Sequence, residues 1–358
     1  MRTIEVTGSS SYPILTGIAL EEIGAYLDSH LKGISNIVIV TQQLVADFHL
    51  KRLLSGLQDY KVKVLTVPQG EEAKSLTCLS KLTTEGVEAG MDRHSLVIAL
   101  GGGVVGDLAG FFAAIYMRGV RFLQIPTTLL AQVDSSIGGK VAVNHEEGKN
   151  LLGAFYPPQA VGMDFSTLET LPWSEVQNGL AETVKHAILG DAELFEFLEK
   201  ERGAIAKRDL EIWRELTVRS LMVKVKIVGE DEKEHGKRAF LNLGHTFGHA
   251  LETEGNFTEL THGQGVSVGI AAAAYLAESR GYIETKERER MISLLQAFRL
   301  PISVAGKDRH KLLSLMGADK KNQAGRKVLI LPVGIGQVTS CKDCSDEEIL
   351  WAWDRVID

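Results

Sequence analysis

The stretch SLVIALGGGVVGDLAG, residues 95–110, runs from an apolar β-branched segment through clustered glycines into an apolar helical segment. Glycines at such a turn let the backbone approach a phosphate, and the first N–H groups and dipole of the helix favour the anion. Gly101, Gly103 and Gly106 match the spacing G-x-G-x-x-G. The stretch therefore favours an α/β domain that binds a dinucleotide.

Two features separate this turn from a standard dinucleotide fingerprint. It follows a later strand of the domain, about the fourth, rather than the first, and no acidic residue lies about 20 residues later to hold a ribose hydroxyl. A tight turn with packing glycines is the alternative.

PQGEEAKS, residues 68–75, places Glu71 and Lys74 at the start of a predicted helix, where they either contact a ribose and a phosphate or cap a surface helix.

Short β-branched runs alternate with helical patterns in the first half of the chain, and helical patterns dominate after about residue 165. This rhythm predicts βαβ units followed by a helical region. The predicted strands are 36–41, 61–67, 95–100 and 122–127, the predicted helices are 175–189, 207–228, 239–253, 263–280 and 284–297, and 327–340 predicts a late hairpin.

The length of 358 residues suits two domains. We expect an α/β N-terminal domain with a Rossmann-like parallel sheet over residues 1–165, followed by a mostly α-helical C-terminal domain over residues 166–358. The boundary is expected within 157–172, and a cleft between the domains is the natural place for a site.

Composition and charge exclude several classes of protein. A net charge of −7 argues against binding to nucleic acid or to an anionic membrane surface. No stretch has the length needed to span a bilayer, and the N-terminus has no apolar export segment, so a cytoplasmic protein is expected. Cys78, Cys341 and Cys344 form no disulfide framework, and the CKDC pair is interpreted as incidental.

A long polar segment, PTTLLAQVDSSIGGKVAVNHEEGKN at 126–150, carries Asp134, Lys140, Asn144, Lys149 and Asn150 among small residues. Long glycine-rich loops in compact domains tend to be functional or disordered, and the β-like KVAVN favours order. Two lysines in an acidic chain either meet an anionic ligand or lie solvated on the surface.

Histidines and acidic residues gather in the helical half. NLGHTFGHALE, residues 242–252, places His245 and His249 on one helix face, either as half of a metal site or as a polar pair. GLAETVKHAI at 179–188 adds Glu182, Lys185 and His186, and THGQGV adds His262 just before a helix. One carboxylate and two histidines from three helices would resemble a catalytic zinc site with one position open.

Several cations and one amide lie in the same half: Lys224, Arg238, Asn242 and Lys321. A dication with several cations around it favours a substrate that carries more than one negative group, such as a phosphate and a carboxylate.

The chain resembles the 3-dehydroquinate synthases of the sugar phosphate cyclase family. The shared motifs, in family order over about residues 68–322, are PQGEEAKS, GGGVVGDLAGFFAAIYMRGV, PTTLLAQVDSSIGGKVAVNHEEGKN, GLAETVKHAI, KRAFLNLGHTFGHALE, THGQGVSVG and DKKN. This chain has KVAVN where the family often has KTGVN, and HEEGKN where a proline often follows the histidine; neither change removes a charged group.

The resemblance implies a role for each matching residue. Glu182, His245 and His262 would hold the metal, and His249 would lie on the substrate side. The positions that match contacts to substrate, metal-bound hydroxyl or phosphate are Arg118, Asp134, Lys140, Lys149, Asn150, Lys185, Lys224, Arg238, Asn242 and one of Lys320 or Lys321. The positions that match NAD contacts are Glu71, Lys74, Gly102, Gly103, Asp107, Thr127, Thr128 and Thr170, with Lys140 and Lys149 shared between NAD and substrate.

The implied enzyme is a carbon–oxygen lyase of the shikimate pathway of aromatic amino acid biosynthesis, with bound NAD and Zn²⁺, or Co²⁺ in its place. It would convert 3-deoxy-D-arabino-heptulosonate 7-phosphate to 3-dehydroquinate and phosphate by transient oxidation, phosphate elimination, re-reduction, ring opening and intramolecular aldol closure. A homodimer is the expected assembly. The rivals are a metal- and NAD-dependent polyol dehydrogenase of the glycerol type and a non-catalytic NAD-binding regulator.

Overall fold

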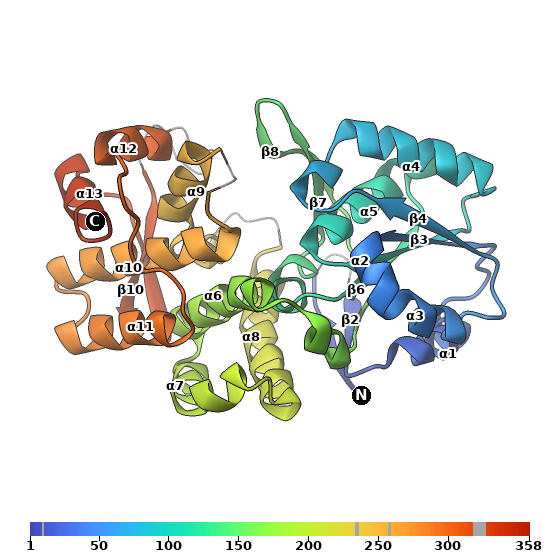
Figure 1. The fold of residues 1–358 in the computed structure, drawn as a ribbon, viewed down its shortest axis with the longest axis horizontal. Coiled ribbons are helices and arrows are strands. Elements are labelled where there is room, and N and C mark those ends of the chain that lie inside the picture. Colours follow the sequence, from blue (N-terminus) through green and yellow to red (C-terminus); the bar gives the residue numbers. More distant parts are fainter. Residues whose placement is uncertain (9–10, 233–235, 257–258, 318–326) are drawn as a thin grey trace. The chain divides into compact units, whose positions relative to one another are not determined.

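The computed structural model describes residues 1–8, 11–232, 236–256, 259–317 and 327–358 and divides into two compact units. The first unit is Met1–Pro172, and the second is Trp173–Asp358. Figure 1 colours the first from blue to green and the second from yellow-green to red. The boundary predicted between residues 165 and 166 falls at the start of a short 3-10 helix, η6 (Phe165–Thr170), which belongs to the first unit.

A seven-stranded sheet forms the centre of the first unit, in the order β1-β2-β9-β6-β5-β3-β4. Its strands are β1 (Arg2–Val6), β2 (Tyr12–Thr16), β3 (Ile37–Gln42), β4 (Val62–Val67), β5 (Leu96–Gly101), β6 (Arg121–Pro126) and β9 (Ala160–Met163). Apart from β1, which pairs antiparallel with β2, the strands run parallel. The predicted parallel sheet is confirmed, and β3, β4, β5 and β6 begin and end within one residue of the predicted runs.

The sequence patterns missed β1, β2 and β9 because each is a run of five residues or fewer. The other elements of this unit are η1 (Leu20–Glu22), α1 (Ile23–His30), α2 (Gln43–Val45), η2 (Ala46–Leu50), α3 (Lys51–Gly56), η3 (Glu71–Ala73), α4 (Leu76–Glu88), α5 (Gly103–Ile115), η4 (Tyr116–Arg118) and η5 (Ala131–Ser135).

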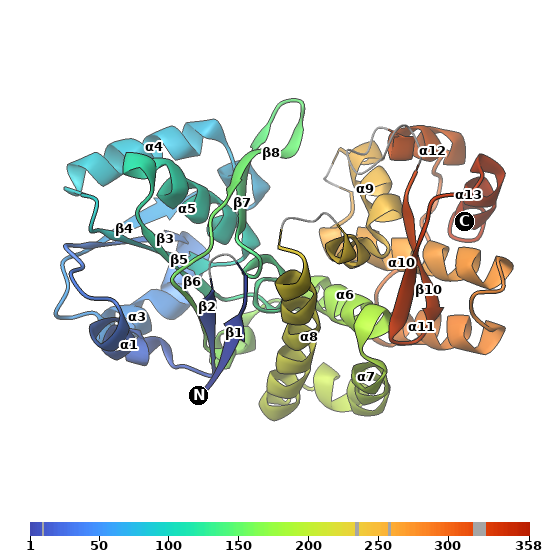
Figure 2. The ribbon, with the colours of Figure 1, turned by 180° about the vertical axis from the view of Figure 1, so that it is seen from behind.

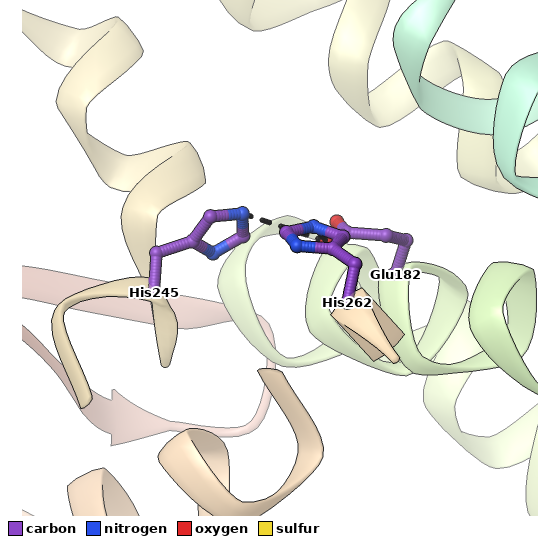
Figure 3. A group of neighbouring side chains, drawn as sticks. All are labelled: Glu182, His245 and His262. Atoms are coloured by element: carbon purple, nitrogen blue, oxygen red, sulfur yellow. Dashed lines mark ion pairs between the residues drawn. The ribbon is translucent and has the colours of Figure 1, made fainter. Parts of the chain in front are cut away.

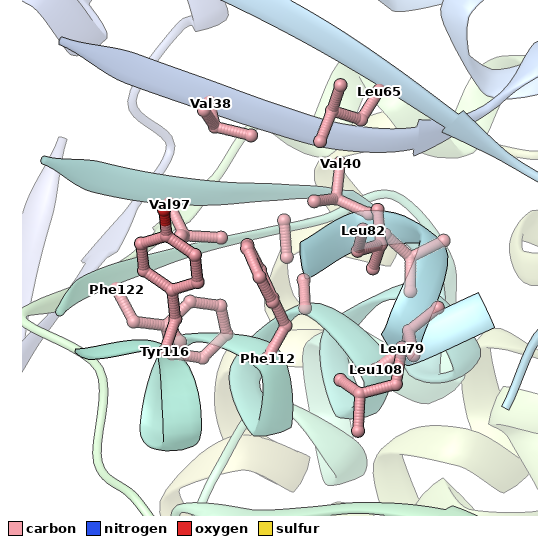
Figure 4. Close-up of a cluster of buried hydrophobic side chains, with 14 of the residues drawn as sticks. Val38, Val40, Leu65, Leu79, Leu82, Val97, Leu108, Phe112, Tyr116 and Phe122 are labelled. Atoms are coloured by element: carbon pink, nitrogen blue, oxygen red, sulfur yellow. The ribbon is translucent and has the colours of Figure 1, made fainter. Parts of the chain in front are cut away.

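Side chains of β3 and β5 alternate between two buried clusters, as expected for strands covered on both faces. Val38, Val40 and Val97 pack with Phe112 of α5 and Leu82 of α4 (Figure 4). The residues that alternate with them join a second cluster with apolar residues of α1 and α3. This double burial explains why the strands read as continuous apolar runs.

The strand order reverses between β3 and β5. From β3 the chain moves outward to β4, then returns to the other side of β3 to form β5, and continues to β6. In open parallel sheets, ligands bind outside the carboxyl ends of the strands at such a switch point. The glycine turn follows β5 directly, so the topology places it there.

A hairpin of β7 (Lys140–His145) and β8 (Gly148–Phe155) forms the second half of the polar segment at 126–150 (Figure 2). Its inner strand packs against α5, where Val141 joins the buried cluster. A Cβ at Gly110 would lie only 2.3 Å from Cγ1 of Val141. Glycine at that point of α5 therefore lets the hairpin approach the helix.

The second unit is mainly helical, as predicted. Its elements are α6 (Trp173–Gly190), α7 (Ala192–Ala206), α8 (Leu210–Glu230), η7 (Lys237–Asn242), α9 (His245–Glu254), α10 (His262–Ser279), α11 (Thr285–Ala297), α12 (Arg309–Gly317) and α13 (Asp346–Trp353), with the hairpin β10 (Leu329–Gly334) and β11 (Gln337–Cys341). The predicted late hairpin is confirmed. None of the helices in the described ranges combines the length and apolar character needed to cross a bilayer.

The single helix predicted over 239–253 is wrong. A 3-10 helix ends at Asn242, the chain turns at Gly244 with φ of 77°, and α9 begins at His245. A Cβ at Gly244 would lie 2.8 Å from Cγ1 of Ile270 and from the carbonyl oxygen of Val266. Tight packing against α10 at a left-handed glycine thus overrides the local helical pattern.

Candidate active site

Most residues predicted to bind a nucleotide follow the carboxyl ends of parallel strands in the first unit. Glu71 and Lys74 come after β4, and Gly102 and Gly103 come after β5. Thr127 and Thr128 follow β6, and Thr170 ends η6 after β9. Because these ends meet at one edge of the sheet, residues distant in sequence lie along that edge, which is where open parallel sheets generally bind ligands.

The glycine turn brings backbone groups close together. The amide of Thr127 donates to the carbonyl oxygen of Gly101 over 3.0 Å. A Cβ at Gly102 would lie 3.0 Å from Cγ2 of Thr128, and one at Gly103 would lie 2.8 Å from Oγ of Ser135. The N-cap residue of α5 is Gly102, and no side-chain hydrogen bond caps this helix. Its first backbone N–H groups therefore suit a phosphate, as predicted for a dinucleotide site.

Lys74 is 5% exposed, and its amine donates to Oδ2 of Asp107 over 2.6 Å and to Oδ1 of Asn150 over 2.5 Å. Glu71 accepts a hydrogen bond of 2.8 Å from the side-chain amide of Asn144. The structure thus brings together residues predicted for NAD and for substrate, joined by an asparagine that the site prediction omitted.

The remaining predicted residues of the first unit lie on short elements. Lys140 is exposed at the start of β7, and Lys149 is half-buried in β8. Asp134 is half-buried in η5, a π-helix. Arg118 is exposed at the end of η4 with φ of +68°, a left-handed conformation that a non-glycine residue seldom adopts. Thr170 bonds to Nε2 of buried His49 over 3.1 Å.

Three residues predicted to hold a metal come together in the second unit (Figure 3). Glu182 lies on α6, His245 begins α9 and His262 begins α10. Oε1 of Glu182 is 3.5 Å from Nε2 of His245 and 3.3 Å from Nε2 of His262. All three candidate ligand atoms lie within 4.8 Å of one another.

These distances suit a tetrahedral divalent ion. Ligands about 2.0–2.1 Å from zinc are separated from one another by about 3.3–3.4 Å. Both measured separations are close to that value. One carboxylate and two imidazoles leave a fourth position for a substrate oxygen, which is typical of a catalytic site rather than a structural one.

Outer contacts orient each candidate ligand. Nδ1 of His245 bonds to the carbonyl oxygen of Leu243 over 3.1 Å, and Nδ1 of His262 bonds to Oε1 of Glu252 over 2.8 Å. A carbonyl and an ionised carboxylate can only accept, so both Nδ1 atoms carry the hydrogen and both Nε2 atoms turn toward Glu182. The other oxygen of Glu182, Oε2, pairs with Lys185, and both of those side chains are buried.

Before a metal binds, His262 favours its protonated form. Burial disfavours the imidazolium, but hydrogen bonds to Glu182 and Glu252 outweigh it and raise the pKa of His262 to about 10. Glu252 was missed by the sequence analysis. Its signal is present, since it lies two helical turns after His245 on the same face of α9.

Glycines on α9 and α10 explain how the two histidines meet. A Cβ at Gly269 would lie 1.9 Å from the carbonyl oxygen of Gly244, and one at Gly248 would lie 2.9 Å from that of Gly265. The helices therefore touch backbone to backbone at two levels. A similar contact joins α10 to α6, because a Cβ at Gly263 would lie 2.5 Å from Cα of Asn178.

Buried cations lie on elements that pack against the metal group. Lys185 on α6 is 1% exposed, Lys224 on α8 is 6% exposed and Arg238 on η7 is 3% exposed, and these three elements contact one another. Asn242 ends η7. The ring centroid of His249 lies 5.4 Å from that of His245. Lys320 and Lys321 fall outside the described residues.

Comparison with known families gives matches across most of the chain. Residues 64–178 match the family model described as 3-dehydroquinate synthase N-terminal, and residues 179–322 match the model described as 3-dehydroquinate synthase C-terminal. A 3-dehydroquinate synthase of Desulforamulus reducens is 44% identical over 98% of this chain and 99% of its own length. One of Nitrosococcus oceani is 43% identical over 96% and 95%.

Solved structures agree with this assignment. A 2-epi-5-epi-valiolone synthase from Streptomyces hygroscopicus, with NAD⁺ and Zn²⁺ bound, superposes with a TM-score of 0.90 at 27% identity over 99% of both chains. A probable glycerol dehydrogenase from Sinorhizobium meliloti covers 96% of this chain and 95% of its own, with a TM-score of 0.63 at 14% identity, and shares only the fold. With both family models and relatives over 40% identical across nearly its whole length, this chain belongs to the 3-dehydroquinate synthase family.

Proposed function

We propose that this protein converts 3-deoxy-D-arabino-heptulosonate 7-phosphate to 3-dehydroquinate and phosphate, as a step of the shikimate pathway. The observation that carries the proposal is the Glu182, His245 and His262 group, whose separations of 3.3 and 3.5 Å suit a catalytic dication. Likeness to named 3-dehydroquinate synthases over almost the full chain supports this substrate over a neutral polyol.

We assign NAD to the carboxyl edge of the sheet and a zinc or cobalt ion to the Glu182 group. A solved relative at 27% identity contains NAD⁺ and Zn²⁺, which supports both assignments. When bound, NAD would accept and return a hydride, and the ion would act as a Lewis acid toward a substrate hydroxyl.

The chain's own residues would bind and orient the substrate. Lys185 holds one oxygen of Glu182, so that the other oxygen faces the two histidines. Lys224, Arg238 and Asn242, on elements packed around α6, would bind the substrate carboxylate. Lys224 and Arg238 are buried and Asn242 is half-buried, and a partly dehydrated position strengthens each interaction with an anion.

The lysines of the hairpin, Lys140 and Lys149, would neutralise the charge that develops on the departing phosphate, and Arg118 would contact the same group. His249 stands beside His245 and would hold or move a proton of the substrate. Holding the product of elimination in a folded conformation makes the final aldol closure nearly unimolecular.

The decisive experiment incubates purified protein with the heptulosonate phosphate, Zn²⁺ and a catalytic amount of NAD. We expect phosphate release that matches formation of a product with the mass of 3-dehydroquinate, without accumulation of NADH. A glycerol-type dehydrogenase would instead give a steady rise in absorbance at 340 nm with NAD and glycerol. That result, without phosphate release from the sugar phosphate, would overturn the proposal.

Variants test the assigned cations. Lys140→Ala and Arg238→Ala should fold and lose roughly 10²–10³-fold in kcat, the usual cost of removing one group that stabilises developing charge. Lys200→Ala is the matched control, because its side chain is 81% exposed on α7. A kcat/KM near that of the unmodified enzyme in either site variant would remove that residue from the mechanism.

We also infer a homodimer in the cytoplasm. The three cysteines are free thiols, which supports a reducing compartment. Light scattering of the purified protein tests the dimer, and a monomer at working concentrations would refute it.

A further inference from the structure

Asn144 occupies an irregular point of the hairpin. The strands pair regularly from Lys140 and Phe155 up to Val143 and Leu152, and then the register shifts before His145 pairs with Gly148. Asn144 is the β7 residue inside this shift, and the β8 segment opposite it includes Asn150, whose φ is +53°. A left-handed backbone at a non-glycine residue is strained unless its surroundings hold it.

The side chain of Asn144 holds that backbone. Its Oδ1 accepts a hydrogen bond of 3.0 Å from the amide of Asn150, in place of the ladder bond lost at the bulge. The backbone N–H of Asn144 donates to the carbonyl oxygen of Lys74 over 2.8 Å, and its side-chain Nδ2 donates to Oε1 of Glu71 over 2.8 Å. A half-buried asparagine therefore joins both strands of the hairpin to the turn after β4.

The same arrangement closes a ring of side chains. With its backbone fixed, Asn150 presents Oδ1 to the amine of Lys74 at 2.5 Å. That amine also pairs with Asp107 on α5 at 2.6 Å. A ligand that contacts Glu71, Lys74 or Asp107 would therefore change the hydrogen bonds of Asn144 and Asn150. These two residues would pass the change to β8, the strand that carries Lys149.

We propose that Asn144 is a positioning residue that couples nucleotide binding at Glu71 and Lys74 to the conformation of the β7–β8 hairpin, so that NAD arranges the hairpin lysines for the phosphorylated substrate. The proposal rests on the NAD site proposed above. It adds a residue that contacts neither ligand and acts through its donor–acceptor match with Glu71.

This match makes the proposal testable by exchanging donor and acceptor. Asn144→Asp sets a carboxylate against Glu71, at a position where 2.8 Å now separates a donor from an acceptor. We expect NAD, titrated calorimetrically into the purified protein, to bind roughly tenfold or more weakly, the size expected when a hydrogen bond to a charged group is lost. KM for the sugar phosphate should rise more than kcat falls.

Glu71→Gln supplies the rescue. The side-chain amide that it introduces can donate to the carboxylate introduced by Asn144→Asp. In the Glu71→Gln background, Asn144→Asp should therefore weaken NAD binding by less than about threefold, a coupling that a double-mutant cycle isolates from any direct effect of Glu71 on NAD. Asn144→Ala lacks both donor and acceptor, and Glu71→Gln should not rescue it. Asn256→Asp, the same change at an exposed residue, is the control and should leave NAD affinity unchanged.

Hydrogen exchange of residues 140–155 gives a readout that does not depend on turnover. NAD should protect these amides in the unmodified protein and in the rescued double variant, but not in Asn144→Asp. Equal NAD affinities for Asn144→Asp and the unmodified protein, or equal losses with and without Glu71→Gln, would refute the coupling. If Asn144→Asp does not fold, unchanged protection by NAD in Asn144→Ala refutes it instead. Unmodified protein that binds no NAD would contradict the proposed function itself.

Discussion

Replacing Gly269 by alanine should push α10 away from the start of α9 and weaken metal binding. A Cβ at this position would lie 1.9 Å from the carbonyl oxygen of Gly244, whereas ordinary contacts begin at 3.4 Å. The gap must therefore open by about 1.5 Å, the difference between the two distances. Oε1 of Glu182 lies 3.5 Å from Nε2 of His245 and 3.3 Å from Nε2 of His262, so this displacement is close to half of either separation.

The size of the effect follows from two opposing terms. Overpacking of this kind costs about 1–3 kcal/mol and sometimes more, while alanine in a helix interior gains about 1 kcal/mol over glycine. We expect Gly269→Ala to lower the free energy of unfolding of metal-free protein by about 2 kcal/mol, since the clash here is with backbone that cannot move aside cheaply. Zinc affinity should fall at least tenfold, roughly the loss seen when an outer contact of a metal ligand is removed.

Other glycines of the same unit form a graded series. Gly248→Ala places Cβ 2.9 Å from the backbone of Gly265 and should have an intermediate effect. Gly203→Ala on α7 meets no atom within 4 Å and should stabilise the protein slightly, with no change in zinc affinity. Urea unfolding of chelator-treated protein and zinc titration against a competing chromogenic chelator measure both quantities. Gly269→Ala with the zinc affinity of Gly203→Ala would refute the argument.

Three further outcomes are expected. Glu252→Gln should weaken zinc binding about 10–100-fold in the same chelator competition, since the neutral amide orients His262 less strongly; equal affinity would contradict this. Lys185→Met removes the buried ammonium that pairs with Oε2 of Glu182. The melting temperature of metal-free protein should therefore fall further than that of zinc-loaded protein, and equal shifts would speak against the pairing. Burial disfavours the imidazolium of His262, but hydrogen bonds to Glu182 and Glu252 raise the pKa of His262 to about 10. The stability that these hydrogen bonds contribute to metal-free protein is fully present below about pH 6.5 and is lost as the pH rises toward 10. The urea midpoint of metal-free protein should therefore decrease over that range, and a flat profile would contradict this contribution.

Local pattern was sufficient for much of the fold. The apolar runs of β3 and β5 are continuous because both faces of those strands are buried, and such runs can be recognised without knowing their neighbours. The turn at Gly102 and Gly103 could also be predicted locally, because strand, glycines and helix are adjacent in sequence. Short edge strands such as β1 offer too few residues for a period to emerge.

The sequence by itself determined which side chains are available for a metal and a nucleotide, because residue chemistry and local periodicity are written in the order of the chain. Only the tertiary structure decided that Gly244 ends one helix and starts another, that Glu252 supports His262, and that Asn144 joins the hairpin to Glu71. Each of these depends on contact between different segments. Such contacts are set by how closely helix and strand backbones approach, which local periodicity does not encode.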